Sequence, residues 1–223
     1  MPFRELVVVD DAGAEAGRRL GAAIGDAVAE RGAATIALSG GSAPARMLPS
    51  VGGDVDWEAV DIVQVDERIA PDGDEDRNLG PILGHLPAAA RPRVRPMPVT
   101  AQDLEAAADA YAVDLPSRFD VIHLGIGADG HTASLVPGDP VLDVLDRDVA
   151  LTSEAYQGRR RMTLTFPALA RAGLVLWLVT GRDKAVALRK LLADDERIPA
   201  SRVAAPRQVV VADPAATMFG SGA

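Results

Sequence analysis

One histidine of this chain has the surroundings expected of an acid–base group. His131 closes the glycine-rich stretch GIGADGH (125–131), which follows the apolar run DVIHL (120–124). An imidazole is the side chain best suited to take up and return a proton near neutral pH. Asp129 is close enough in sequence to orient the ring or to share its proton. We therefore predict that His131 is a general base at the end of a strand.

Other interpretations of this turn have less support. A single histidine is often structural, and His85, after a helix-like run, and His123, within a strand, are expected to be so. Three glycines around His131 at a strand end favour a functional role instead. Ser134 follows closely, but a serine hydrolase of the common type would carry a GxSxG elbow, which this chain lacks.

A second glycine-rich turn has the composition of a phosphate-binding loop. SGGSAP (39–44) joins an apolar run to a predicted helix, with Pro44 in the first turn. Gly40 and Gly41 let the backbone approach a ligand closely, and free amides at a helix start favour an anion. A plain strand-to-helix turn remains the alternative. The stretch is neither GxGxxG nor a P-loop, so a nucleotide site has little support.

Charged residues follow another predicted strand. In QVDER the residues Asp66, Glu67 and Arg68 are consecutive. An arginine at a strand end can bind a carboxylate or phosphate through two nitrogens, and the acids could hold it or contact sugar hydroxyls. A surface charge cluster is the alternative. The acidic stretch 72–76 lacks EF-hand spacing and is expected to be a solvated loop.

Further cations could serve an anionic ligand. RRRMTLTF (159–166) places three arginines at the start of a predicted strand, and Lys184 lies in the first turn of a predicted helix. Both could be solvent-exposed. A lysine at a helix start is unfavourable beside the helix dipole, however, and a bound anion would relieve this.

The elements that must position these residues alternate between strand and helix. Continuous Val/Ile/Leu runs indicate strands buried on both faces, and the alternation predicts an α/β fold with a parallel sheet. The predicted strands lie at 5–9, 34–38, 60–65, 93–97, 120–124, 161–166, 174–179 and 208–212. The predicted helices lie at 14–32, 101–115 and 183–194, and two more begin near Pro44 and Pro214. Ligands of such sheets bind at the carboxyl ends of the strands.

Bulk composition narrows the class of protein. The 223 residues suit a single domain (1–223), and the net charge of −9 argues against nucleic-acid or anionic-membrane surfaces. There are no cysteines, which excludes disulfides and thiolate chemistry. The N-terminus is unlike a signal peptide, and no apolar stretch approaches the ~20 residues of a membrane span. We expect a soluble, cytoplasmic protein, monomeric or homodimeric.

The motifs together resemble the 6-phosphogluconolactonase family. SGGS, DER, GIGADGHTASLVPG, RMTLT and GRDKA occur in the order seen in that family, and the resemblance covers essentially the whole chain. The family is grouped with glucosamine-6-phosphate deaminases, which share a Rossmann-like three-layer α/β/α fold. The resemblance implies hydrolysis of 6-phospho-D-glucono-1,5-lactone, the second step of the oxidative pentose phosphate pathway. It implies no cofactor and no obligatory metal.

The resemblance also suggests roles for individual residues. His131 matches the proposed general base, with Asp129 beside it, and Asp66 and Arg68 match a polar pair at the sugar end. The residues that match substrate-binding positions are Gly40, Gly41, Ser42, Asn78, Arg161 and Lys184. The last two match a cationic clamp for the phosphate. Two departures are Ala43, where threonine is usual, and Arg77, where serine commonly precedes the asparagine.

Two rival functions follow from the same pattern. An aminosugar phosphate deaminase would carry an asparagine-glutamate pair at the positions of Ser134 and Leu135, and a tyrosine in place of Arg68. A sugar-phosphate sensor would normally carry a DNA-binding helix-turn-helix, for which this chain has no spare residues or basic face. The sequence favours the lactonase.

Overall fold

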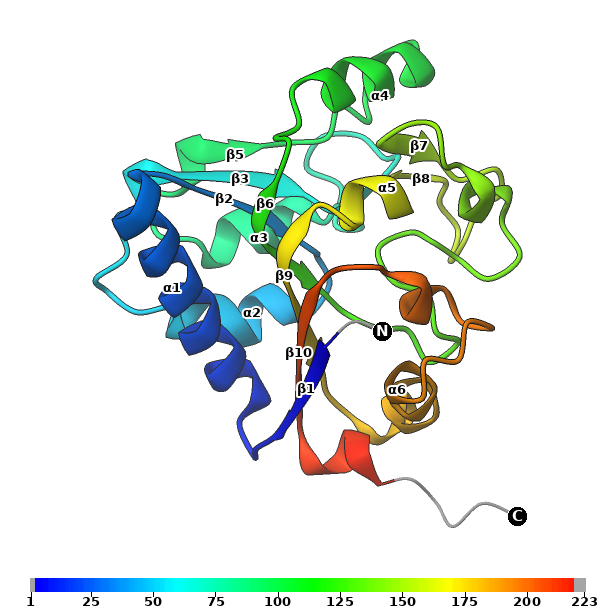
Figure 1. Ribbon diagram of the computed structural model, residues 1–223. Helices are drawn as coiled ribbons and strands as arrows, with labels where there is room; N and C mark the ends of the chain where they lie inside the picture. Colours follow the sequence, from blue (N-terminus) through cyan, green and yellow to red (C-terminus); the bar gives the residue numbers. More distant parts are fainter. Residues whose placement is uncertain (1–2, 219–223) are drawn as a thin grey trace, which may run out of the picture.

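A parallel sheet forms the centre of the molecule (Figure 1). The computed structural model describes residues 3–218, and it confirms the predicted α/β class. Across the sheet, seven strands of this part of the chain follow the order β1 (Phe3–Val8), β10 (Arg207–Ala212), β9 (Ala172–Val179), β6 (Phe119–Leu124), β2 (Ala34–Leu38), β3 (Val60–Gln64) and β5 (Val94–Arg95). All neighbouring pairs in this sheet run parallel.

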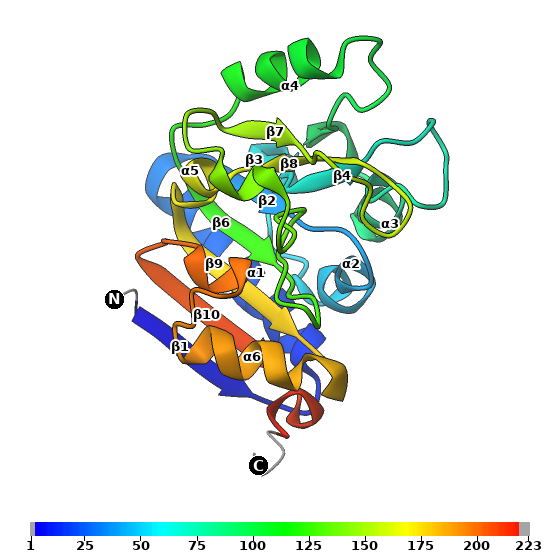
Figure 2. The same ribbon diagram turned by 90° about the vertical axis from the view of Figure 1, so that its right-hand side faces the viewer.

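Helices cover both faces of the sheet and complete the predicted three layers. One apolar cluster lies under α1 (Ala12–Arg31), α2 (Ala43–Met47) and α3 (Leu79–His85). A second cluster lies under α4 (Leu104–Val113), α5 (Phe166–Leu169) and α6 (Ala185–Leu192). Figure 1 shows α1 and α2 to the left of the sheet and α6 to its right, and Figure 2 turns the second layer toward the viewer. Within β6, Val121 packs in the first cluster and Ile122 in the second, as the period of a strand requires.

A small antiparallel sheet is the main difference from the predicted fold. It contains β4 (Asp66–Arg68), β8 (Arg161–Leu164) and β7 (Val149–Leu151), in that order. The chain changes sheets at Val65, whose amide donates to Leu38 O of the large sheet while its carbonyl accepts from Leu164 N. The DER residues therefore form a strand of their own rather than the open end of β3.

The order of the strands creates a switch point between β2 and β6. From β2 the chain proceeds to β3 and β5 at one edge, whereas from β6 it proceeds to β9 and β10 toward the other edge. The connections leave the carboxyl ends of β2 and β6 in opposite directions, which opens a crevice there. Both glycine-rich turns begin at this point, since SGGS follows β2 and GIGADGH follows β6.

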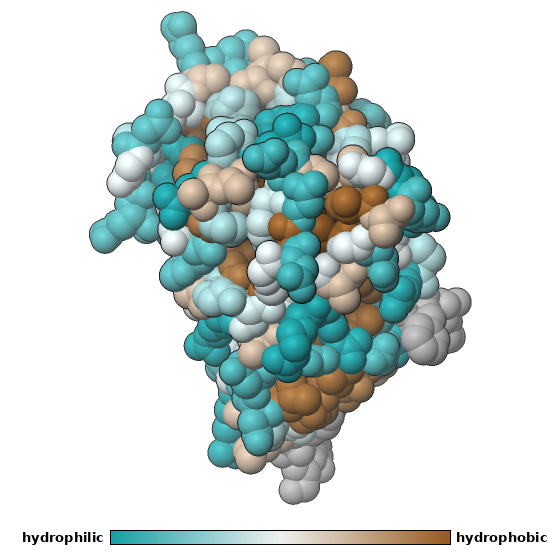
Figure 3. Space-filling view, turned by 90° about the vertical axis from the view of Figure 1, so that its left-hand side faces the viewer, coloured by the Kyte–Doolittle hydropathy of each residue, from teal (hydrophilic) through white to brown (hydrophobic). Residues whose placement is uncertain are grey.

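The outer surface is mainly hydrophilic on the face that Figure 3 presents, where the hydrophobic areas are separate from one another. Leu6 and Val8 of the edge strand β1 are 39% and 45% exposed. No helix within residues 3–218 is both long enough and apolar enough to cross a membrane.

His123 predicts how the stability of the fold depends on pH. It is fully buried in β6, and neither ring nitrogen has a hydrogen-bond partner among residues 3–218. Burial lowers its pKa from 6.5 to about 4. Between these values the unfolded chain binds a proton that the folded one does not. The free energy of unfolding is therefore unaffected by protonation of this histidine well above pH 6.5. It decreases as pH falls from there toward 4, by roughly 3 kcal/mol in total.

Chemical denaturation of the wild type and of His123→Leu, between pH 7 and pH 4, checks this prediction. Leucine needs no hydrogen bond and does not titrate, so the free energy of unfolding of the variant should fall less over this range. Parallel pH profiles for the two proteins would contradict the prediction.

Candidate active site

A cavity of about 280 Å³ opens at the carboxyl ends of β2, β3, β6 and β9. Nine of the ten predicted site residues line it, and all ten lie within the described residues. The nine are Gly40, Gly41, Ser42, Asp66, Arg68, Asn78, His131, Arg161 and Lys184. The tenth, Asp129, is not in the cavity lining but contacts the ring of His131. The topology therefore brings together residues that are up to 144 positions apart (40 to 184) in the sequence.

The glycine turn holds His131 at the cavity. Gly130 N donates to Gly127 O at 2.9 Å, and Gly127 N donates to His131 O at 2.8 Å, so the chain folds back on itself over five residues. A Cβ on Gly127 would lie 2.1 Å from His131 Nδ1, which leaves no room for any side chain there. The side chain of His131 is 20% exposed. Gly127 is thus required by the position of the ring itself.

Asp129 selects the tautomer of His131. Its Oδ1 lies 2.7 Å from His131 Nδ1 and accepts the backbone N–H of His131 at 3.1 Å. Partial burial raises the pKa of Asp129, but these hydrogen bonds and one from Tyr156 outweigh it and lower the pKa below its usual value. A carboxylate only accepts, so Nδ1 carries the proton and Nε2 is left with a free lone pair.

Asp66 is a buried carboxyl group at the wall of the cavity. It is 4% exposed. Ser134 Oγ donates to its Oδ2 at 2.6 Å, and Asn78 Nδ2 donates to its Oδ1 at 3.2 Å. Burial raises its pKa, although the Ser134 hydrogen bond and the charges of Arg161 and Arg68 oppose this. Ser134 is itself fully buried, and its hydroxyl is engaged with Asp66. This agrees with the sequence, which gives little support to Ser134 as a nucleophile.

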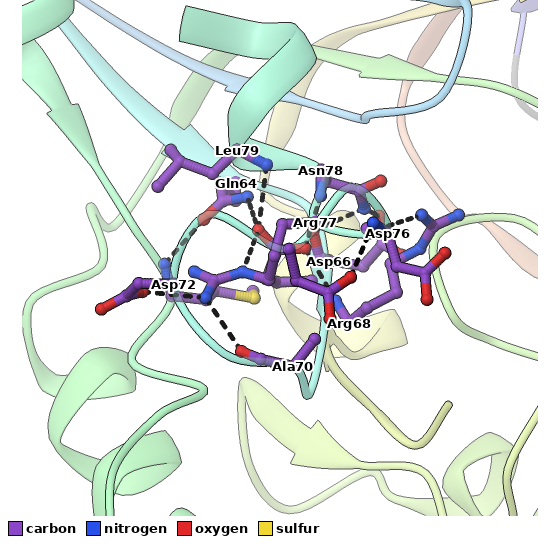
Figure 4. A network of polar contacts seen from close by, with 12 residues as sticks. Gln64, Asp66, Arg68, Ala70, Asp72, Asp76, Arg77, Asn78 and Leu79 are labelled. Atoms are coloured by element: carbon purple, nitrogen blue, oxygen red, sulfur yellow. Dashed lines mark hydrogen bonds and ion pairs between the residues drawn. The ribbon is translucent and has the colours of Figure 1, made fainter. Parts of the chain in front are cut away.

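Glu67 organises the loop beyond β4 through its contacts with Gln64, Arg77, Asn78 and Leu79, which Figure 4 labels. Its carboxylate is fully buried and accepts Asn78 N at 2.6 Å, Leu79 N at 3.0 Å and Gln64 Nε2 at 2.9 Å. Arg77 Nε forms an ion pair with it at 3.1 Å. These contacts fix the start of α3, from which Asn78 reaches Asp66. Arg77, which stands where serine is common in the family, therefore supplies the positive charge that compensates the buried carboxylate of Glu67.

Asn78 also packs tightly on the first glycine turn. A Cβ on Gly40 would lie 2.1 Å from Asn78 Oδ1, so only glycine fits at this position. Ser42 is the N-cap of α2 and its side chain makes no capping hydrogen bond. Ser42 lines the cavity.

The cavity is rich in cations although the chain as a whole is acidic. Arg68 of β4 and Arg161 of β8 occupy directly opposite positions in the antiparallel pairing of these two strands. Lys184 follows β9 as the N-cap of α6 and lies 3.0 Å from Asp183 Oδ2. Arg46 of α2 also lines the cavity and donates to Thr180 Oγ1 at 2.9 Å. Such a lining favours an anionic ligand.

Sequence reasoning missed several residues of the site. Arg46, Gln157 and Thr180 line the cavity, and Tyr156 contacts the Asp129–His131 pair. Thr180 directly follows a predicted strand, a position that could have marked it. Arg46, Tyr156 and Gln157 lie in stretches with no comparable pattern. No group of three or more His, Cys, Asp or Glu side chains within residues 3–218 is arranged to hold a metal ion.

Comparison with known proteins identifies the family. The model of glucosamine-6-phosphate isomerases/6-phosphogluconolactonases matches residues 9–212. The chain belongs to this family. It is 36% identical over 198 residues to a 6-phosphogluconolactonase of Mesorhizobium japonicum, covering 83% of each chain.

Solved structures show the same fold. A 6-phosphogluconolactonase from Shewanella baltica superposes with a TM-score of 0.84 at 26% identity, over 96% of this chain and 97% of that one. A monomeric glucosamine-6-phosphate deaminase superposes with a TM-score of 0.81 at 20% identity, over 99% of this chain and 100% of that one. The fold is therefore common to both activities of the family, and the choice between them depends on the site.

Gly127→Ala tests the fit of the glycine turn around His131. The new methyl group occupies the space of Nδ1, and because the ring can rotate away, we expect displacement of His131 rather than unfolding. A crystal structure of the variant should lack the 2.7 Å contact with Asp129. Gly53→Ala is the matched control, because a Cβ there meets nothing within 4 Å. An unmoved His131 ring in Gly127→Ala would contradict the prediction.

Proposed function

We propose that this chain hydrolyses 6-phospho-D-glucono-1,5-lactone to 6-phosphogluconate. The observation that carries the proposal is the pairing of His131 with Asp129 at the wall of a cation-rich cavity. Relatives that bear the name 6-phosphogluconolactonase support the same substrate. A phosphorylated sugar lactone offers an anion for the cations and a carbonyl for the base.

The proposed mechanism uses His131 twice. Nε2 takes a proton from a water molecule, whose oxygen attacks the lactone carbonyl at C1. The tetrahedral intermediate then collapses, the bond from C1 to the ring oxygen breaks, and His131 returns the proton to that oxygen. Asp129 keeps Nδ1 protonated throughout and stabilises the positive charge on the ring. A δ-lactone is an activated ester, so the demand on the catalyst is modest.

Charge develops on the carbonyl oxygen during this reaction. Arg68 and the backbone amides of the glycine turns are the proposed stabilisers, because donors already in place need no reorganisation. Asp66 stands beside Arg68 in β4, and we propose that it contacts the sugar hydroxyls together with Asn78. Its raised pKa makes a protonated, hydrogen-bond-donating form more accessible than for an exposed aspartate.

The phosphate is proposed to bind to Gly40, Gly41 and Ser42, with Lys184 and Arg161 as cationic partners. Arg46 adds a further positive charge to the same cavity. Binding at a distance from C1 holds the carbonyl in line with the attacking water, which is positional catalysis. No cofactor or metal takes part in this scheme. A cytoplasmic location and a monomeric or homodimeric state stay predictions.

An aminosugar phosphate deaminase is the less favoured alternative. Where such enzymes carry an asparagine-glutamate pair, Ser134 is bonded to Asp66 and Leu135 is buried in the core. No carboxylate therefore stands at that position, and Arg68 occupies the place of their tyrosine.

An assay with fresh lactone tests the proposal. Acid release from newly prepared 6-phosphogluconolactone at neutral pH should exceed its spontaneous rate. His131→Ala should lower kcat by about 10²–10⁴ and leave KM largely unchanged, whereas His85→Ala, at the exposed end of α3, serves as control. A kcat of His131→Ala near that of the wild type would remove His131 from its role. Ammonium release from glucosamine 6-phosphate, without lactone hydrolysis, would instead favour the deaminase.

Lys184→Ala tests the phosphate end. Loss of one cation should raise KM by roughly tenfold with little change in kcat, since uniform binding energy is removed. Lys190→Ala on α6, away from the cavity lining, is the matched control. A fall in kcat at constant KM would contradict the assignment of Lys184.

A further inference from the structure

Tyr156 reaches the proposed catalytic pair from outside the glycine turn. It lies in the loop between β7 and β8, where Tyr156 N donates to Arg159 O at 3.0 Å and closes a tight turn. The hydroxyl donates to Asp129 Oδ2 at 2.9 Å. The phenol ring meets the ring of His131 edge-on, with centroids 5.1 Å apart.

Arg161 holds this tyrosine in place. Its Nη2 donates to Tyr156 O at 3.2 Å and to Gln157 Oε1 at 3.2 Å. Its guanidinium carbon lies 5.1 Å from the centre of the phenol ring, within the range of a cation–π contact. Arg161 itself is 3% exposed and belongs to β8. The tyrosine is thus tied to a rigid strand although it lies in a loop.

Asp129 needs a second anchor to orient His131. Its side chain is 38% exposed, and the terminal torsion of an aspartate is broad. Both of its hydrogen bonds to His131, from the backbone N–H and from Nδ1, go to the same oxygen, Oδ1, so they leave the position of Oδ2 undefined. Oδ1 forms its hydrogen bond with His131 Nδ1, and Oδ2 accepts a hydrogen bond from the Tyr156 hydroxyl. With both oxygens engaged, the carboxylate plane is defined, and so is the direction in which it accepts the Nδ1 proton.

We propose that Tyr156 is a positioning residue that holds Asp129, and through it His131, in the orientation for proton transfer. The inference rests on the proposed hydrolysis, in which His131 is the base. The hydroxyl also lies 3.3 Å from His131 Nδ1, but its own proton is donated over the shorter distance of 2.9 Å to Asp129 Oδ2. We therefore assign its effect mainly to Asp129, and Tyr156 does not exchange a proton with the substrate. Burial and the neighbouring carboxylate raise the pKa of Tyr156, which keeps its hydroxyl protonated and able to donate.

A double-mutant cycle tests this coupling. Tyr156→Phe keeps the ring and the cation–π contact and removes only the hydroxyl. We expect kcat to fall by roughly tenfold with KM within about twofold of the wild type, a size typical of coupling within one network. In an Asp129→Ala background the same substitution should lower kcat by less than about twofold, because the group it acts through is gone.

The alternatives give different results. An equal loss in both backgrounds would mean that Tyr156 acts independently of Asp129, and an unchanged kcat in Tyr156→Phe would mean that it does not act; either overturns the proposal. Tyr111→Phe is the matched control, because it deletes the hydroxyl of the only other tyrosine, which bonds Gln64 N and Arg95 O outside the cavity lining. It should leave kcat unchanged.

A readout without substrate separates this proposal from the proposed function. The chain has three histidines, so the ¹⁵N resonances of His131 can be assigned with His131→Ala. The wild type should show the Nδ1–H tautomer, and Tyr156→Phe should show a mixture of tautomers. An unchanged His131 spectrum in Tyr156→Phe overturns the positioning role. A wild type with this spectrum but no lactone hydrolysis would overturn the proposed function instead.

Discussion

The parallel pairing of β2 with β6 is the constraint on which the site depends. It aligns Leu38 with His123, so that the two glycine-rich turns begin side by side although they are more than 80 residues apart in the chain. Ser39 Oγ donates to His123 O at 3.0 Å, which ties the start of one turn to the end of the other strand. Because strand order reverses at this pair, the connections leave β2 and β6 in opposite directions and a crevice opens above it. Both the proposed base and the proposed phosphate loop occupy that space.

Two consecutive acidic residues, Asp66 and Glu67, have different structural roles at the edge of the cavity. Successive side chains of β4 point in opposite directions, so Asp66 faces the cavity while Glu67 faces the loop that leads to α3. A buried carboxylate is unfavourable unless it is paired and hydrogen-bonded. Glu67 meets this condition through three backbone amides, Gln64 and Arg77. These contacts hold the loop in the position from which Asn78 Nδ2 donates to Asp66 Oδ1.

The sequence predicted the large sheet because its strands are apolar runs separated by periodic helices. Nine predicted residues line the cavity. Those in the turns after the parallel strands follow from the convergence of strand ends on one edge, whereas Asn78 and the choice of Arg161 among three arginines came from the family resemblance. The small sheet was not predicted, since β4 and β7 are three residues long and their pairing with β8 is antiparallel and long-range. The helix α3 was noted only as a helix-like run before His85 and given no bounds, because LGPILGH contains proline and two glycines; packing of Ile82 outweighs this poor propensity. Tyr156 could not be predicted, because its partner Asp129 lies 27 residues away and nothing in either stretch indicates the contact.

A crystal structure with 6-phosphogluconate bound tests the central claim most directly. Our mechanism predicts that the C1 carboxylate lies within hydrogen-bonding distance, roughly 3 Å, of His131 Nε2. It predicts at the same time that the phosphate contacts Gly41, Ser42 and Lys184. A product bound in the reverse direction, with its phosphate beside His131, or a His131 Nε2 that does not face C1, would contradict the mechanism.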